Sequence, residues 1–176
     1  MRLHARKLTL CGMLLTLIII GAYIKIPIPY VPFTLQFLFI TLAGQLLGWK
    51  MGGLVVCVYV TMGLIGLPIF TYGGGISYVL QPTFGYIVGF IFAAISSGFI
   101  VEKFKFKYRR YVANFVGMLC MYFCGVVYLY FLYSLCFGQR LGITYILEIG
   151  VILQLPGDII LSLVSAGLAP RLQKMI

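Results

Sequence analysis

The chain of 176 residues is 62% hydrophobic and 9% charged, with a formal net charge of +10 and a mean hydropathy of +1.11. These values exclude an ordinary soluble domain, which is nearer half apolar and a quarter charged and has too little interior for so many apolar side chains. The distribution of the positive charge argues against nucleic-acid binding. The basic residues lie in short segments between apolar runs, and no RNA-binding motif accompanies them.

The apolar runs are long enough to cross a lipid bilayer. Residues 8–24, 51–101 and 111–138 contain no Lys, Arg, Asp or Glu, and about 20 apolar residues form a helix that crosses roughly 30 Å of hydrocarbon. The first run reaches Lys25 and Pro27 without a small-residue cleavage site, which favours a transmembrane helix over a signal peptide. We therefore expect one all-α integral membrane domain over residues 1–176.

Proline, glycine and charged residues divide the chain into successive elements. The segment IPIPYVPFTLQ at 26–36 is irregular, because three closely spaced prolines exclude a regular helix. A second irregular segment at 66–82 is uncharged and rich in Gly, aromatic and hydroxyl residues. The six predicted transmembrane helices span residues 8–26, 35–48, 51–66, 83–101 and 111–137, with the last beginning at Pro156.

The start of the last helix is ambiguous, because Pro156-Gly157 stands in the middle of the apolar run 145–169. Proline suits the first turn of a helix, where its missing N–H costs nothing. We therefore expect a short interfacial helix near 143–152 and a final helix from Pro156. This choice places Asp158 in the first turn of a helix, near one membrane face.

The distribution of Lys and Arg predicts the orientation of the chain in the membrane. With six spans, both termini share a side with the loops after the second and fourth helices, and that side holds every basic residue except Lys25 and Arg140. We therefore expect both termini in the cytoplasm. The segments 26–36, 66–82 and 138–156 then face outward and are expected to enclose a pocket, because irregular backbone at membrane depth must be buried or line a cavity.

Asp158 is the most informative single residue. An acidic group at the edge of a transmembrane helix is costly and indicates a functional role. Its carboxylate can accept strong hydrogen bonds from the N–H groups of a ligand. The alternative is that Asp158 caps its own helix and interacts with the positive end of the helix dipole. The two roles are compatible.

Other polar and aromatic side chains near the outward segments are further candidates for ligand contacts. Amide side chains can donate and accept hydrogen bonds, although a solvated loop amide is equally ordinary. Aromatic rings wall many ligand sites, but an interfacial aromatic belt also accounts for them. The predicted substrate-contacting residues are Thr34, Gln36, Thr71, Tyr72, Tyr86, Gln154 and Asp158.

Gly12 and Thr16 form a small-xxx-small pattern on the first predicted helix. This spacing lets another helix approach closely. The partner helix can belong to the same chain or to another protein, and the pattern alone leaves both possibilities open.

The residues needed for catalysis or metal binding are missing from the sequence. The chain has a single histidine, His4, five cysteines that all lie in apolar runs, and three acidic residues. It contains no Ser-His-Asp set, no paired carboxylates and no Walker A sequence. We therefore expect neither an enzyme nor a metal site, and no cofactor.

Several stretches, taken in order, resemble the BioY family. They are IPIPYVPFTLQ (26–36), LAGQLLGWKMGG (42–53), YVTMGLIGLPIFTYGGG (59–75), PTFGYIVGF (82–90) and LPGD (155–158). Each stretch is weak by itself, but the ordered set is specific and covers nearly the whole chain. Residues 103–140 are generic apolar sequence.

The resemblance implies a six-helix substrate-binding (S) component of an energy-coupling-factor (ECF) transporter in a bacterial cell membrane. Members of the family bind biotin from outside, and most assemble with a transmembrane coupling protein and two cytoplasmic ATPase subunits. The loops after the first and third helices would close over the ligand. The resemblance also implies that Gly12 and Thr16 lie where the coupling protein docks.

One position departs from the family pattern. The family continues PGD with two apolar residues and a Lys, whereas this chain has Leu161 at that position. Lys25, Arg140 or the N–H groups of the last helix could then receive the ligand carboxylate. The alternatives are an S component for another vitamin or for a biotin precursor. A membrane assembly protein without a ligand is a further possibility.

Overall fold

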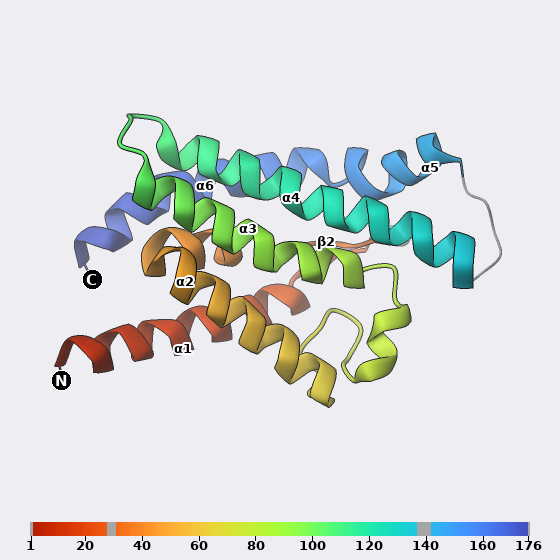
Figure 1. Ribbon diagram of the computed structural model, residues 1–176, viewed down its shortest axis with the longest axis horizontal. Helices are drawn as coiled ribbons and strands as arrows, with labels where there is room; N and C mark the ends of the chain where they lie inside the picture. Colours follow the sequence, from red (N-terminus) through yellow and green to blue (C-terminus); the bar gives the residue numbers. More distant parts are fainter. Residues whose placement is uncertain (1, 28–30, 137–141, 176) are drawn as a thin grey trace.

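The computed structural model describes residues 2–27, 31–136 and 142–175, which form a bundle of long helices with both termini at one end (Figure 1). The long helices are α1 (Arg2–Tyr23), α2 (Gln36–Ile65), α3 (Phe84–Lys103), α4 (Arg109–Phe131) and α6 (Leu155–Met175). The short elements are strands β1 (Lys25–Ile26) and β2 (Phe33–Thr34), the 3₁₀-helix η1 (Ile76–Leu80), helix α5 (Ile143–Leu147) and the π-helical turns η2 (Leu132–Cys136) and η3 (Glu148–Ile152).

The bundle has the length and surface of a membrane protein. Five helical segments of the described chain are long and apolar enough to cross a bilayer, namely Ala5–Tyr23, Gln36–Ile65, Phe84–Lys103, Arg109–Leu135 and Ile143–Met175. Large apolar side chains such as Leu8, Phe123 and Leu163 are exposed on the outside of the helices. A surface of this kind is stable in lipid, so the prediction of an all-α membrane protein is confirmed.

The structure counts five long helices where the sequence predicts six, and the difference arises at Gly48. Helix α2 continues through the second and third predicted helices, but Gly48 interrupts it with non-helical backbone angles, φ 82° and ψ 169°. A methyl group added to Gly52 would lie 2.7 Å from Cα of Gly44, so the two arms of α2 fold back on each other. This reversal lets the two termini share one end of the molecule.

The segment before α6 follows the predicted division at Pro156. Helix α5 and the π-helical turn η3 occupy 143–152, and α6 begins at Leu155, so Pro156 lies in its first turn. The missing N–H of proline is one that a first turn leaves unpaired in any case. Asp158 is therefore placed at the start of α6, as the sequence predicts.

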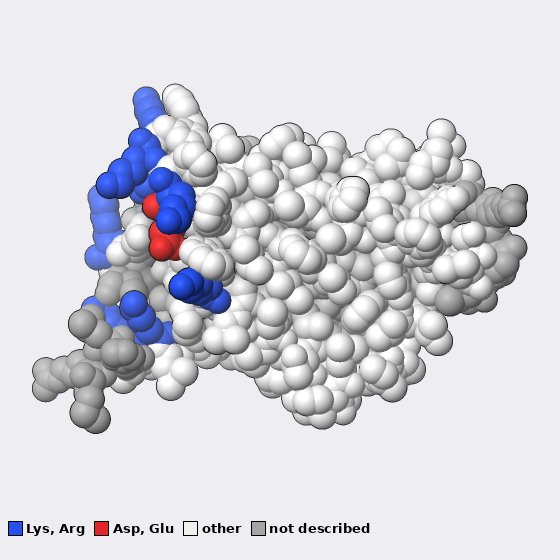
Figure 2. Space-filling view, in the orientation of Figure 1, with Lys and Arg blue, Asp and Glu red and all other residues white. Residues whose placement is uncertain are grey.

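Basic side chains gather at the end of the bundle that carries both termini (Figure 2). A buried polar network ties the helices together there. Arg110 donates to Oε1 of Gln45 at 3.0 Å, Gln45 donates to Oδ1 of Asn114, and Asn114 donates to the carbonyl of Ser162 at 2.8 Å. The network joins α2, α4 and α6, because in lipid each buried polar group must find its partner within the protein.

We expect Gly48→Ala to lower the melting temperature of the purified protein in detergent. The backbone at Gly48 occupies a region that residues with a Cβ rarely adopt, and the strain costs of order 1–3 kcal/mol. Gly12→Ala is the matched control, because a methyl group there meets no atom within 4 Å. Equal melting temperatures for both variants would contradict the folded-back α2.

Candidate functional site

A small cavity lies at the end of the bundle opposite the termini. It is about 30 Å³ in volume and lies between the helices and the two covering segments, the β1–β2 hairpin and the loop after α2. Six of the seven predicted contact residues line it. The lining residues are Val31, Pro32, Thr34, Gln36, Phe37, Thr71, Thr83, Tyr86, Ile87, Phe90, Met121, Gln154 and Asp158.

Asp158 is buried in this lining, with 3% of its surface exposed. The hydroxyl of Tyr122 on α4 donates a hydrogen bond of 2.6 Å to Oδ2 of Asp158. A carboxylate has two oxygens and about four acceptor positions. Asp158 therefore retains capacity to accept further N–H groups from a molecule in the cavity.

Gln154 provides a donor beside this acceptor. Its side chain is 5% exposed, and its Nε2 has no hydrogen-bond partner among the described residues. A buried donor without a partner costs about 1–3 kcal/mol. Two residues of the cavity lining thus carry an unsatisfied N–H group and a carboxylate, a combination that fits a polar ligand offering both a carbonyl and N–H groups.

Gln36 and Thr34 connect the two covering segments. Nε2 of Gln36 donates to the hydroxyl of Tyr59 at 2.7 Å, and Tyr59 donates to the carbonyl of Ile69 at 3.2 Å. The hydroxyl of Thr34 donates a longer bond of 3.4 Å to Oε1 of Gln36. Gln36 therefore anchors the loop after α2 as well as facing the cavity.

Tyr86 forms a rigid part of the wall. Its hydroxyl donates to the carbonyl of Gly150 at 2.8 Å. A methyl group added to Gly125 would lie 2.4 Å from the Tyr86 ring, so the ring packs flush against α4. Its position is fixed from two sides.

Tyr72 does not line the cavity, in contrast to the prediction. Its side chain is 51% exposed, and Nζ of Lys25 lies 4.5 Å from the centre of its ring. Lys25 also donates to the carbonyl of Thr71 at 2.8 Å. Tyr72 faces outward because its neighbour Thr71 is the residue of this pair that lines the cavity, and Tyr72 and Lys25 form part of the outer rim.

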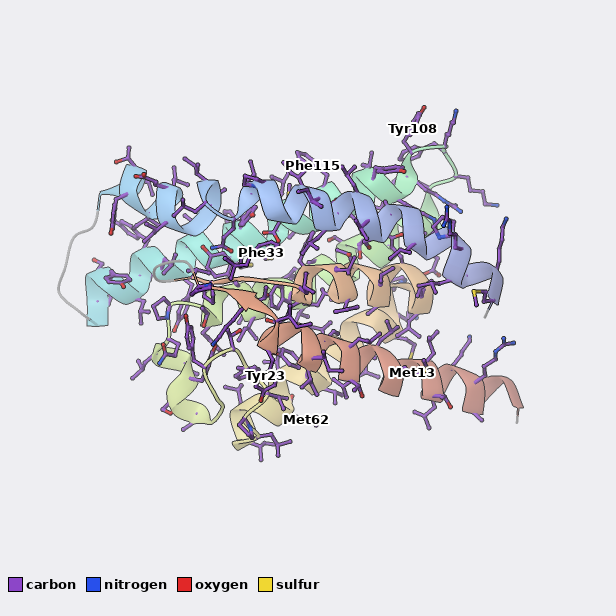
Figure 3. The ribbon with its side chains drawn as sticks, turned by 180° about the vertical axis from the view of Figure 1, so that it is seen from behind. Met13, Tyr23, Phe33, Met62, Tyr108 and Phe115 are labelled. Carbon is purple, nitrogen blue, oxygen red and sulfur yellow. The ribbon has the colours of Figure 1, made fainter. Side chains whose placement is uncertain are left out.

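Aromatic packing holds the covering segments over the cavity. Phe70 is fully buried and packs against Tyr59 and Tyr78, with ring centroids 5.3 Å and 4.6 Å apart. Phe33, labelled in Figure 3, reaches from β2 to the first turn of α6, where a methyl group on Gly157 would lie 2.4 Å from its ring. Gly157 therefore permits the hairpin to close directly beside Asp158.

Some residues at the cavity carry no signal that sequence patterns could detect. Tyr122 and Met121 lie in an apolar run where one aromatic or Met side chain resembles any other, and only the fold brings Tyr122 to Asp158. Thr83 does carry a signal in the sequence, because it follows Pro82 at the start of a predicted helix. Its hydroxyl pairs with that of Tyr78 at 2.9 Å.

The remaining sequence candidates lie outside the cavity. Gly12 and Thr16 lie on the exposed face of α1, and the Thr16 hydroxyl donates to the carbonyl of Gly12 at 2.9 Å. A methyl group on Gly12 would meet no atom within 4 Å, so the pair does not serve packing within the described chain. Leu161 is 8% exposed and belongs to the core. Arg140 lies outside the described residues.

The described residues contain no group of three or more side chains placed to hold a metal ion. The polar groups of the cavity are a carboxylate, amides and hydroxyls. Such a set recognises a ligand through hydrogen bonds and offers no evident nucleophile paired with a base.

Known proteins of similar sequence identify the family of this chain. A profile of the BioY family matches residues 1–176. A probable biotin transporter BioY of Lysinibacillus sphaericus is 41% identical over 171 residues, which are 96% of this chain and 87% of the relative. The biotin transporter BioY of Thermotoga maritima is 37% identical, with 97% of each chain covered.

The fold matches a solved structure as well. The 2.1 Å crystal structure of the S-component for biotin from an ECF-type ABC transporter superposes with a TM-score of 0.86 at 27% sequence identity. The match covers 98% of this chain and 93% of that one. The sequence profile, the relatives and the fold agree, and the chain belongs to the BioY family.

Proposed function

We propose that this chain is the biotin-binding S component of an ECF-type vitamin importer in the cell membrane. It takes up biotin from the outer side and is not itself an ATPase or an enzyme. Membership of the BioY family, in which relatives are named biotin transporters, supports the substrate. The observation that carries the proposal is a cavity lined by both Asp158, with its carboxylate, and Gln154, whose amide nitrogen has no hydrogen-bond partner among the described residues.

The ureido ring of biotin has two N–H donors and one carbonyl. Asp158 accepts from the N–H groups, while Gln154 donates to the carbonyl. Thr34, Gln36 and Thr71 supply further polar contacts, and Tyr86 walls the apolar bicycle. Hydrogen bonds to a charged group in a dry site are the strong ones, so Asp158 contributes most of the polar affinity. No metal or cofactor is needed for this recognition.

Binding requires the covering segments to move. Ligand pockets usually have volumes of roughly 300–1,000 Å³, at least ten times the cavity of about 30 Å³ seen here. Strands β1 and β2 are the part best placed to move, because only two residue pairs join them and neither strand is part of a helix. Biotin enters when Phe33 leaves Gly157 and is enclosed when Phe33 returns.

Asp158→Ala is expected to weaken biotin binding by roughly 10–150-fold, because the loss of a hydrogen bond to a charged group costs about 1.5–3 kcal/mol. Equilibrium binding of labelled biotin to the detergent-purified protein measures the effect. Glu148→Ala is the matched control, since Glu148 is exposed and does not line the cavity. An affinity unchanged in Asp158→Ala would remove Asp158 from the site.

This chain has Leu161 where the family pattern has a Lys. We propose that Lys25 binds the biotin carboxylate instead. Its ammonium group already lies at the cavity rim, bonded to the carbonyl of Thr71. Because Lys25 is exposed, its contribution is modest, and Lys25→Gln should weaken biotin binding by up to about fivefold. Biotinamide, which lacks the carboxylate, should bind Lys25→Gln and the unaltered protein equally. An equal loss for biotin and biotinamide, or no loss for biotin, would assign the carboxylate elsewhere.

Transport requires partners, for which we propose a transmembrane coupling protein and two cytoplasmic ATPase subunits. The exposed face of α1 around Gly12 and Thr16 is the proposed docking surface, because small residues let a partner helix approach closely. The basic end of the bundle then faces the cytoplasm, which agrees with the positive-inside rule.

Gly12→Leu is expected to prevent co-purification with the coupling protein while leaving the affinity for biotin unchanged. A Leu side chain fits on the exposed face without disturbing the bundle, so folding should be normal. Gly12→Ala keeps the residue small and should retain assembly. If Gly12→Leu assembles as well as the unaltered chain, α1 is not the docking face at this point.

Two alternatives remain for the activity. An S component for another vitamin or for a biotin precursor would share the fold and the cavity, and Leu161 is the feature that favours this possibility. A membrane assembly protein without a ligand would have no use for a buried, unpaired amide, so Gln154 argues against it.

A further inference from the structure

A basic pocket opens at the end of the bundle that carries the termini, away from the cavity. Its rim carries Lys105, Lys107, Arg109 and Arg110, and its floor is formed by small residues of α6. The pocket has a volume of about 780 Å³, and none of its lining residues is acidic. Its residues are Lys105, Phe106, Lys107, Arg109, Arg110, Tyr111, Ala166, Gly167 and Pro170.

The two arginines are fixed by the protein. Arg109 donates to the carbonyl of Phe104 at 3.1 Å. Arg110 donates to Gln45 and to Gln173 on two other helices. The pocket therefore has a preorganised cationic wall, and the two lysines lie in the loop between α3 and α4.

An apolar groove continues from this pocket between α4 and α6. Tyr111 belongs to both, and the groove then passes Val112, Phe115 and Leu163, whose side chains are 41–54% exposed. Figure 3 shows Phe115 on the outer edge of the bundle, on the side where Tyr108 marks the turn between α3 and α4. From Tyr111 to Met118 the groove extends about 10 Å along the helix axis.

The floor between pocket and groove is open. Ser162 and Ala166 are one turn apart on α6, and a methyl group added at the next residue, Gly167, would meet no atom within 4 Å. A cationic pocket joined to an apolar groove at a membrane surface is complementary to an anionic phospholipid. The headgroup would lie at the lysines and an acyl chain would lie between the helices. Basic pockets between transmembrane helices bind such headgroups.

We propose that this surface is a binding site for one anionic phospholipid of the leaflet at the basic end of the bundle. The bound lipid covers the shallow contact between α4 and α6. The positive-inside rule by itself asks only for basic residues at this end. It does not explain why four of them surround one pocket that leads into an apolar groove.

The experiment uses the delipidated, purified chain titrated with phosphatidylglycerol and followed by native mass spectrometry. Phosphatidylcholine with the same acyl chains tests the charge, and glycerol phosphate as competitor tests whether a free phosphate suffices. We expect a single phosphatidylglycerol to bind, phosphatidylcholine to bind at least tenfold more weakly, and glycerol phosphate not to displace the lipid.

Lys105→Gln with Lys107→Gln should weaken phosphatidylglycerol binding roughly 25-fold, because each lysine near an anionic lipid surface contributes about fivefold. Lys7→Gln with Lys50→Gln is the control, since it removes the same charge near the start of α1 and beside the Gly48 kink, outside both the pocket and the groove. Gly167→Leu should fill the floor and also block the lipid while the chain still folds.

Equal binding of phosphatidylcholine, or an equal loss in the control variant, would overturn the proposal in favour of general adsorption. Displacement by glycerol phosphate would show a phosphate site without a lipid. If the Lys105/Lys107 variant kept its lipid but lost assembly with partner subunits, the pocket would be a protein docking site.

Discussion

Hydrocarbon offers no hydrogen bonds, and the structure depends on how this chain satisfies its few buried polar groups. Most of those groups are concentrated in two clusters. At one end, Gln45, Asn114 and Arg110 pair with one another and close the bundle. At the other end, the Asp158 carboxylate is paired with Tyr122, while Gln154 is left with an unpaired donor. The first cluster is complete and structural, and the second is incomplete, as a binding site should be.

The second feature that shapes the site is the close contact between two aromatic rings and the backbone at two glycines. Gly125 lets Tyr86 lie flat against α4, and Gly157 lets Phe33 reach the first turn of α6. Because both contacts converge beside Asp158, small changes in the covering hairpin alter the cavity directly. If this cavity of about 30 Å³ is the biotin site that we propose, ligand binding is coupled to movement of strands β1 and β2.

Hydropathy and the positions of proline, glycine and charged residues predict the helices well, because length and charge decide which segments can cross a bilayer. Asp158 is found from sequence because a lone acid in an apolar segment has few explanations. Tyr122 is not, since its role depends on a contact between residues 36 positions apart. The sequence predicts separate helices at 35–48 and 51–66, and the structure joins them as the two arms of α2, with non-helical backbone angles at Gly48. Tyr72 illustrates the limit for loops, where sequence does not tell which of two neighbours faces inward.

The polar cavity is the proposed biotin site, and equilibrium binding of labelled biotin to the purified chain tests this most directly. Dethiobiotin, lipoate and riboflavin serve as competitors. We predict saturable, biotin-selective binding. Dethiobiotin should compete, because it shares the ureido ring, while lipoate and riboflavin should not. A well-folded sample that binds no biotin, or binds riboflavin or lipoate in preference, would contradict it and point to Leu161 as the position that changed the substrate.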